Sequence, residues 1–214
     1  MVFMQGFGIG ALNHNMEDGD KINAGYNAPS PGSTPENAIN ISSGVTVTAK
    51  MPARFIAAPW MLDAKSQLGM RETTGNNDGP DVVKYLKTVG LKPGAKSYWC
   101  GAFVNWTMNQ AGINGRPENP DRALNWRNFG LSLNKTAYGS VGTLKRKGGG
   151  HVGFLVANDQ DRPGWVIMLG GNQSDAVMYN SFPLRIMQFN YPTGYIPSYN
   201  LSSLSGIRKE IRMQ

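Results

Sequence analysis

Cysteine is nearly absent from this chain, because the 214 residues contain only Cys100. A single cysteine cannot form a disulfide within the chain, and it excludes any metal site built on several thiolates. The thiol is therefore either an inert buried group or a reactive one. Free cysteine is among the most buried residue types, so an inert thiol is the default interpretation. A reactive thiol requires evidence from the residues around Cys100.

Long hydrophobic runs are also missing, since no stretch approaches the about 18 apolar residues that a membrane-spanning helix needs. The opening MVFMQGFGIGAL is apolar, but the first basic residue is Lys21, so the segment lacks the positive start of a secretory signal. We therefore expect no membrane span and synthesis in the cytoplasm without a secretory signal. Work outside the cell would then require delivery by another component.

Negative charge is scarcer than positive charge: 21 Lys and Arg against 14 Asp and Glu give a net charge of +7. A basic surface suits an anionic partner, such as a bacterial wall or another phosphate-rich surface. Nucleic acid is not expected, because the chain has no zinc-finger spacing, no RNA-binding aromatic motif and no basic helical run. The stretch LKRKGGGH, with Lys145, Arg146 and Lys147, is interpreted as a solvated loop.

The first 58 residues are rich in Pro, Gly, Ser and Asn, which predicts turns and extended chain rather than a folded core. Within them, GVTVTAKM predicts one short strand. We expect residues 1–58 to be an irregular extension that acts as a tether or docking segment. A single domain is expected at residues 59–198 and a C-terminal tail at residues 199–214.

Apolar residues recur at helical spacing in four segments before Gly130. Proline near the start and glycine at the end mark three of them, PWMLDAKSQLG, GPDVVKYLKTVG and NPDRALNWRNFG, and Asn119 is the expected N-cap of the last. The segment from Cys100 to Gly112 is apolar over most of its circumference, which predicts a central, buried helix.

After Gly130 the pattern becomes strand-like, in the runs HVGFLVAN, GWVIMLGGN, AVMYNSF and RIMQFNY. Their close spacing favours hairpins over βαβ crossovers. Helices first and antiparallel strands second predict an α+β domain, with N-terminal helices packed on an antiparallel β-sheet.

Cys100 lies at the expected N-terminus of the central helix, where unpaired backbone N–H groups and the positive end of the helix dipole favour the thiolate. A thiol nucleophile needs a base, and the chain has two histidines, His14 and His151. His14 lies in the irregular extension. His151 begins a strand after three glycines that permit close approach of a substrate, so it is the candidate base, although a strand-edge histidine is ordinarily just a polar residue.

A Cys-His pair also needs a polar group that bonds the far imidazole nitrogen and fixes its tautomer. If the two strands after His151 form a hairpin, the polar end GGNQ returns beside the histidine. Asn172 is then the first candidate, with Gln173, Asp159 and Asp161 as alternatives. A simple turn residue is an equally good interpretation of Asn172.

Five stretches in the same order carry a resemblance to a known family: APWMLDAKSQLGMRE, VVKYLKTVGL, WCGAFVNWTMNQAGI, GHVGFLV and VIMLGGNQSDAV. Together they resemble the papain-like cell-wall amidases of the NlpC and CHAP type, closest to a subfamily found in phages and secreted bacterial effectors. The similarity covers residues 59–192 and is specific in WCGAFVNW, GHVGF and LGGNQS taken together. It implies a papain-like fold with catalytic Cys100 and His151, and with Asn172 as the nearest candidate for the third group.

The sequence departs from the family pattern at two places. Ser140 stands where such proteins usually have Asp, in the strand before the histidine. No glutamine precedes the cysteine as it does in papain, so the oxyanion hole would use the Cys100 backbone N–H and a second group, for which Tyr98 is the candidate.

The resemblance implies a peptidoglycan hydrolase that cleaves an amide bond in the wall peptide. Cys100 would attack the carbonyl, His151 would take and return the proton, and water would release the thioester, without a metal or other cofactor. The expected partners are peptidoglycan and, through the N-terminal segment, phage tail or secretion-system proteins. Action is expected in the periplasm or cell wall after delivery, including as part of a virion.

Two alternatives stay open for the function. One is a structural or docking component of a phage tail baseplate. The other is an antibacterial amidase toxin that is injected into rival cells and is held inactive in the producing cell by a cognate inhibitor protein.

Overall fold

The computed structural model describes residues 58–95 and 98–207, together with the backbone of residues 39–40 and 46–47. The chain divides into two compact units, Met1–Met51 and Pro52–Gln214. In the first unit, β1 (Ile39–Asn40) pairs antiparallel with β2 (Thr46–Val47), which lies in the segment predicted to form a short strand. The predicted tether or docking role of residues 1–58 falls almost entirely outside the described residues.

The described part of the second unit contains three α-helices, all in segments that the sequence predicts to be helical. They are α2 (Trp60–Ser66), α3 (Pro80–Lys87) and α4 (Cys100–Gln110). Pro80 occupies the first position of α3, where its missing N–H costs no helical hydrogen bond. α4 buries most of its residues, as its nearly continuous apolar circumference predicts.

The fourth predicted helix is shorter and tighter than expected. Residues Ala123–Asn128 form a 3-10 helix, η3, and Asn119 does not cap it but has a φ of 49°. Side chains take the carbonyl oxygens ahead of η3: Trp126 Nε1 donates to Pro120 O at 2.9 Å, and Asn125 Nδ2 donates to the Glu118 carbonyl at 2.8 Å. Residues 119–122 consequently form a turn instead of the first helical turn.

One sheet of seven strands forms the rest of the described domain. Its order is β3-β8-β4-β5-β6-β7 with antiparallel neighbours, and β9 pairs parallel with the end of β5. The strands are β3 (Leu131–Leu133), β4 (Val141–Arg146), β5 (Gly149–Asp159), β6 (Trp165–Gly170), β7 (Met178–Pro183), β8 (Met187–Tyr191) and β9 (Ser203–Leu204).

Strands β5, β6, β7 and β8 arise from the four apolar runs that predict them. β3, β4 and β9 lie outside those runs. β9 belongs to residues 199–214, which the sequence assigns to a tail, and its backbone pairs with Asn158 and Asp159 of β5. Part of the expected tail is therefore built into the sheet.

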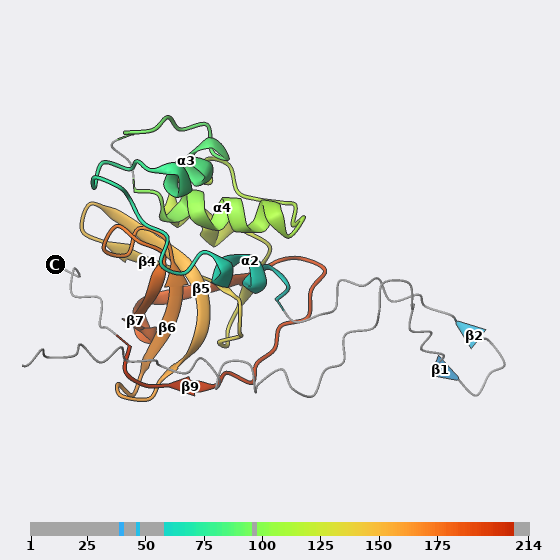
Figure 1. Cartoon of the computed structure of the whole chain (residues 1–214). Coiled ribbons are helices and arrows are strands. Elements are labelled where there is room, and N and C mark those ends of the chain that lie inside the picture. The colour runs from blue at the N-terminus through green and yellow to red at the C-terminus, as the bar shows by residue number, and fades with distance from the viewer. Residues whose placement is uncertain (1–38, 41–45, 48–57, 96–97, 208–214) are drawn as a thin grey trace, which may run out of the picture. The chain divides into compact units, whose positions relative to one another are not determined.

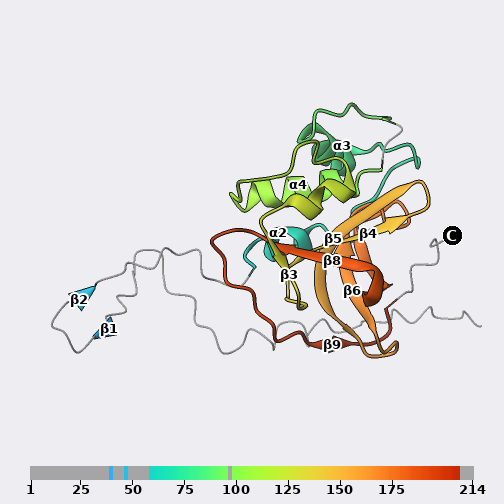
Figure 2. The ribbon, with the colours of Figure 1, turned by 180° about the vertical axis from the view of Figure 1, so that it is seen from behind.

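The helices lie to one side of the sheet (Figure 1). α4 contacts β5 and β6, and α2 and α3 each pack on α4. Seen from behind, β8 and β3 continue the sheet beyond β4 (Figure 2). The rings of Phe103 on α4 and Phe154 on β5 meet edge to face with centroids 6.2 Å apart, both fully buried. Burying each such side chain contributes about 1.5–3 kcal/mol, and the architecture is α+β, as predicted.

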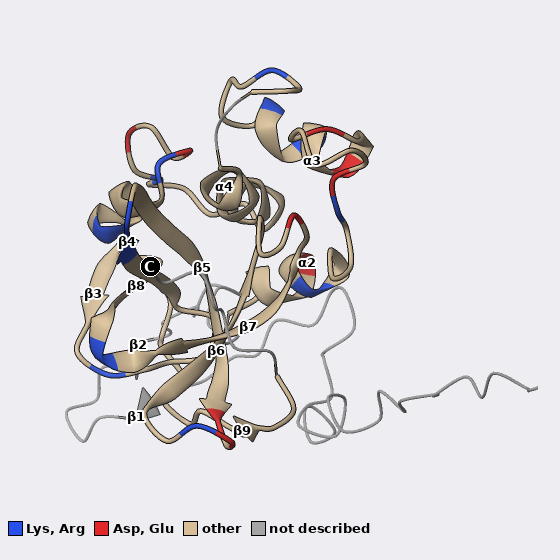
Figure 3. Cartoon of the chain, turned by 90° about the vertical axis from the view of Figure 1, so that its left-hand side faces the viewer, with Lys and Arg blue, Asp and Glu red and all other residues tan. Residues whose placement is uncertain are grey.

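Charged side chains of both signs are interspersed along the described chain (Figure 3). The excess of positive charge is therefore spread over several elements instead of marking one helix. None of the helices in the described ranges is long and apolar enough to cross a membrane.

Candidate active site

Cys100 is the first residue of α4, and its neighbours fix the start of that helix. Trp99 is fully buried and donates from Nε1 to Oε1 of the buried Glu72 at 2.5 Å. Gly101 lies so close to the neighbouring loop that a Cβ there would stand 2.4 Å from the Asp121 carbonyl oxygen. Residues on both sides of the thiol thus place it at a defined point against the sheet.

His151 lies near the start of β5, opposite Leu144 of β4, and is only 2% exposed. Its ring stacks on Phe182 of β7, with centroids 5.3 Å apart and planes 27° from parallel. Its Nε2 is 3.0 Å from Oε1 of Gln173. The imidazole is therefore held by packing on one face and by a hydrogen bond at one nitrogen.

Gln173 fixes the tautomer of the histidine. It is 1% exposed, and its Nε2 donates to the carbonyl oxygen of Met178. Only the NH₂ group can donate to a carbonyl, so Oε1 faces His151 and the imidazole Nε2 carries the hydrogen. The neutral ring then has its lone pair on Nδ1. A Cβ at Gly170 would lie 3.2 Å from both bonded atoms, which explains a glycine at that position.

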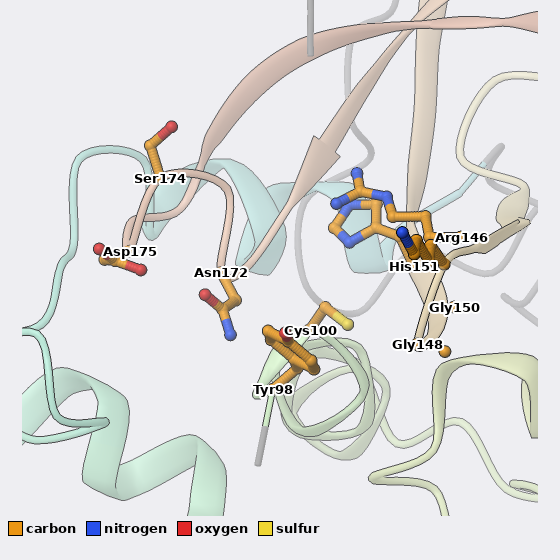
Figure 4. Close-up of a pocket in the computed structure, with 11 residues that line it drawn as sticks. Tyr98, Cys100, Arg146, Gly148, Gly150, His151, Asn172, Ser174 and Asp175 are labelled. Atoms are coloured by element: carbon orange, nitrogen blue, oxygen red, sulfur yellow. The ribbon is translucent and has the colours of Figure 1, made fainter. Parts of the chain in front are cut away.

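Asn172, the first candidate for this contact, occupies a different place. Its φ is 54°, and Ser174 and Asp175 also have positive φ values. All three line a pocket, and in Figure 4 the Asn172 carboxamide lies on the other side of Cys100 from His151. The imidazole partner in the structure is therefore Gln173, one of the alternatives, and Asn172 faces the pocket.

The other two alternatives lie at the far end of β5. Asp159 accepts hydrogen bonds from Ser181 Oγ and, at 2.6 Å, from Arg162. Asp161 accepts one from the Gly206 N–H at 2.6 Å. The Asp161 carboxylate thus holds the segment that contains β9, and the Asp159 carboxylate binds β7 and Arg162, so neither is the partner of His151.

One pocket of about 240 Å³ contains both Cys100 and His151 among its lining residues (Figure 4). One wall is the hairpin between β4 and β5, and the other is the turn after β6. The sulfur of Cys100 is directed toward the wall that carries His151 and Arg146. The remaining lining residues are Tyr98, Lys147, Gly148, Gly149, Gly150, Asn172, Ser174 and Asp175.

The pocket keeps both reactive groups uncharged at neutral pH. Burial raises the pKa of the Cys100 thiol, although a backbone hydrogen bond from Val152 and the Arg146 charge act to lower it. Burial and the Arg146 charge lower the pKa of His151 to about 3. The resting pair is thus thiol and neutral imidazole, whereas the position at the helix N-terminus favours the thiolate, because burial has the largest effect on the pKa of each group.

Tyr98 lies at the rim of this pocket, with 74% of its side chain exposed, beside Cys100. Its expected role as an oxyanion donor stays a prediction. Arg146 and Lys147 also line the pocket, although the sequence pattern assigns them to a solvated loop. The sequence could have indicated this, because Arg146 and Lys147 come directly before the three glycines and His151.

Within the described ranges, no cluster of three or more His, Cys, Asp or Glu side chains could hold a metal ion. Comparisons with protein-family models, with curated proteins and with solved structures find no match to this chain. The function must therefore be argued from the motifs and from the geometry of the site.

Proposed function

We propose that this chain is a peptidoglycan hydrolase with a papain-like fold, which cleaves an amide bond in the wall peptide by a Cys-His mechanism. The observation that carries the proposal is the pocket shared by the only thiol and by a buried histidine whose Nε2 is 3.0 Å from Gln173 Oε1. An inert buried thiol needs no neighbouring imidazole of fixed tautomer. This combination supports nucleophilic catalysis.

In the proposed reaction, His151 Nδ1 takes the proton from Cys100 Sγ as the sulfur attacks the carbonyl carbon. The imidazolium then gives that proton to the amide nitrogen, the C–N bond breaks, and the amine leaves an acyl thioester on Cys100. His151 next takes a proton from water, which attacks the thioester, and the proton returns to sulfur as the acid leaves. Because both groups are neutral at rest, proton transfer accompanies attack.

The oxyanion of the tetrahedral intermediates needs hydrogen-bond donors. The Cys100 backbone N–H at the start of α4 is the first candidate. We assign the second donor to the Asn172 carboxamide, which faces the pocket from the wall opposite His151, and keep Tyr98 as the alternative.

The proposed substrate also agrees with the charge of the chain. A net charge of +7 attracts the protein to an anionic wall. This attraction is long-range and acts between exposed groups, so added salt weakens it over a Debye length of about 8 Å at physiological ionic strength.

The first prediction tests the nucleophile on purified cell-wall sacculi. Wild-type protein should release soluble muropeptides, whereas Cys100→Ala should release none and keep its fold, because no other thiol can attack. Iodoacetamide should inactivate the wild type by alkylating this single cysteine. Gln110→Ala, on the exposed end of α4, is the matched control and should keep full activity.

A Cys100→Ala protein that releases muropeptides at the wild-type rate would sink the cysteine mechanism. A folded wild type that releases none would favour the docking component over the enzyme. Where release occurs, mass spectrometry of the muropeptides identifies the cleaved bond.

A further inference from the structure

Two hollows of different character meet at Cys100. The first is the pocket of about 240 Å³ that contains His151 and the cationic Arg146 and Lys147. The second is a groove of about 410 Å³ on the side of η3, lined in part by Ala123 and Leu124. Tyr98, Cys100, Gly149 and Gly150 line both. A peptide that crosses Cys100 therefore meets two cations, Arg146 and Lys147, on one side of the scissile bond. On the other side it meets apolar residues together with one charge of each sign, Asp121 and Arg122.

Arg146 is held in a defined position in the charged pocket. It is the last residue of β4 and pairs with Gly149 across the hairpin. Its guanidinium carbon lies 5.4 Å from the centre of the Phe182 ring, the same ring on which His151 stacks. Phe182 is fully buried, so it is a rigid support for both side chains. The cation is therefore positioned together with His151, in the pocket that Cys100 also lines.

A role in proton transfer from Cys100 to His151 does not explain why a cation lies at position 146. The Arg146 charge favours the Cys100 thiolate but disfavours the His151 imidazolium, since it lowers the pKa of both groups. These effects oppose each other when a proton moves from sulfur to imidazole. An anionic ligand on the guanidinium would weaken both effects together, so the case for an anion site rests on the place of Arg146 in the pocket.

Resting on the proposed function, we propose that Arg146 binds a free carboxylate of the wall peptide beside the scissile amide, with Lys147 at the rim. A guanidinium donates strong, charge-assisted hydrogen bonds to a carboxylate, and because Nε and Nη2 of Arg146 are buried, the substrate carboxylate would be bound at Nη1. Asp175 lines the same pocket from the turn after β6, on the other side of Cys100 in Figure 4. Its charge directs the substrate carboxylate to the hairpin wall. The enzyme therefore distinguishes wall peptides with free carboxylates from those with carboxamides.

The test compares a disaccharide tetrapeptide that has free carboxylates with the same molecule after conversion of its carboxylates to carboxamides. Wild-type kcat/KM should be about tenfold or more higher for the free acid. Arg146→Gln should bring that ratio close to one, mainly by losing the free-acid substrate, and Arg146→Lys should give an intermediate ratio. Lys145→Gln removes the same charge from the neighbouring exposed position outside both pockets and should keep the wild-type ratio.

A second readout separates carboxylate binding from a general effect on the thiol. If Arg146→Gln lowers kcat/KM equally for both peptides and slows alkylation of Cys100 by iodoacetamide to match, Arg146 only tunes the thiol and the inference is wrong. Equal cleavage of both peptides by the wild type would also overturn the inference while leaving the proposed function standing.

Binding to the Cys100→Ala protein, measured by calorimetry, tests the inference where turnover is absent. If Cys100→Ala binds the free acid more tightly than the carboxamide, and the double variant Cys100→Ala, Arg146→Gln loses this preference, the inference is supported. It is then supported even if the wild type cleaves neither peptide, because absence of cleavage rejects only the proposed function. Equal binding of both peptides, or binding of neither, rejects the carboxylate site. Circular dichroism of each variant checks that the fold is retained.

Discussion

At the scale of single residues, two neighbours in the turn after β6 have different environments. Gln173 is buried against His151, whereas Asn172 faces the pocket with a φ of 54°. Asn adopts this left-handed conformation more readily than most residues, so the turn can direct the two side chains to opposite sides. One side chain then orients the His151 imidazole, and the other faces the pocket in which we propose that the substrate binds.

The second prediction separates these roles by mutation. Gln173→Ala should lower kcat about 10²–10⁴-fold, because the imidazole loses the bond that keeps its hydrogen on Nε2. Asn172→Ala should lower kcat about 10²–10³-fold, the effect of removing one oxyanion donor, and should leave measurable activity. Rates of muropeptide release across pH measure both effects.

The pH profile distinguishes the two variants. Loss of the tautomer-fixing bond should change the pH dependence of kcat in Gln173→Ala, while Asn172→Ala should keep the wild-type profile at a lower rate. Normal activity in Gln173→Ala, together with severe loss of activity in Asn172→Ala, would show that Asn172 and not Gln173 orients the His151 imidazole.

The third prediction concerns acid stability. His151 has a folded-state pKa of about 3, below its ordinary value of 6.5, so the unfolded chain binds the proton first as the pH falls. Stability should be complete above pH 6.5 and should be lost progressively toward pH 3. At pH 4 the loss should be about 3 kcal/mol from this residue alone. Urea unfolding of the wild type between pH 7 and pH 4 measures it.

His151→Gln is the comparison protein for this prediction, because it removes the titrating group from the same buried place. Its free energy of unfolding should change much less over that range than the wild-type value does. The Asp159 carboxyl, whose pKa lies below its ordinary value of 3.8, adds its own acid sensitivity only at lower pH. Parallel curves for the two proteins would show that His151 is not buried in its neutral form.

At the scale of elements, the start of α4 depends on the absence of a side chain at Gly101. A Cβ there would meet the carbonyl oxygens of Asp121 and Pro120 at 2.4 and 2.5 Å, and these are backbone atoms that cannot rotate away. The fourth prediction is that Gly101→Ala destabilises the domain by about 1–3 kcal/mol by pushing α4 from the loop before η3. Thermal or urea unfolding measures the change.

The same substitution should reduce wall hydrolysis more than stability alone explains, because it displaces Cys100 from His151. Gln110→Ala, at the exposed end of the helix, should change neither quantity by much. A Gly101→Ala protein with wild-type stability and activity would show that the loop yields and that the close approach has no role in placing the thiol.

The sequence predicts the elements that have a strong pattern and misses those fixed by tertiary contacts. α4 and β5 were predictable because a mostly apolar circumference and a run of apolar and β-branched residues each suit one structure. The start of η3 was not, since it depends on the Trp126 and Asn125 side chains taking carbonyls of residues 118–120. β9 pairs with a strand more than 40 residues earlier in the chain and shows no pattern of its own.

The candidate site shows the same division. The sequence indicates Cys100 and His151 as candidates because the chain has only one cysteine and two histidines, and because these two lie at the start of a predicted helix and of a predicted strand. The choice between Asn172 and Gln173 depends on the backbone angles of one turn, which composition does not determine. Arg146 was missed because a basic residue beside glycines usually lies in solvent, whereas here it packs over the buried Phe182 ring.

At the scale of the whole molecule, the fifth prediction concerns residues 1–58. We expect them to attach the enzyme to a carrier, because their composition cannot form a core of its own. A chain that starts at Ala53 should fold and hydrolyse purified wall at close to the wild-type rate. It should fail to join a phage tail or a secretion complex.

Limited proteolysis of the full chain tests this role directly. Rapid trimming to a stable, active fragment supports a tether, whereas resistance together with unfolding of the shortened chain would assign the segment to the core. Co-purification with tail proteins would favour a virion component, and co-purification with a tight inhibitor would favour an injected toxin.

The residues that line the candidate active-site pocket belong to two kinds of structure. Cys100 and His151 lie on α4 and β5, which the core holds in place. Arg146 and Lys147 at one wall, and Asn172 and Asp175 at the other, belong to two short connections between neighbouring strands. Under the proposed function, exchanging the residues of either connection should therefore change which wall peptide is accepted while cleavage at Cys100 continues.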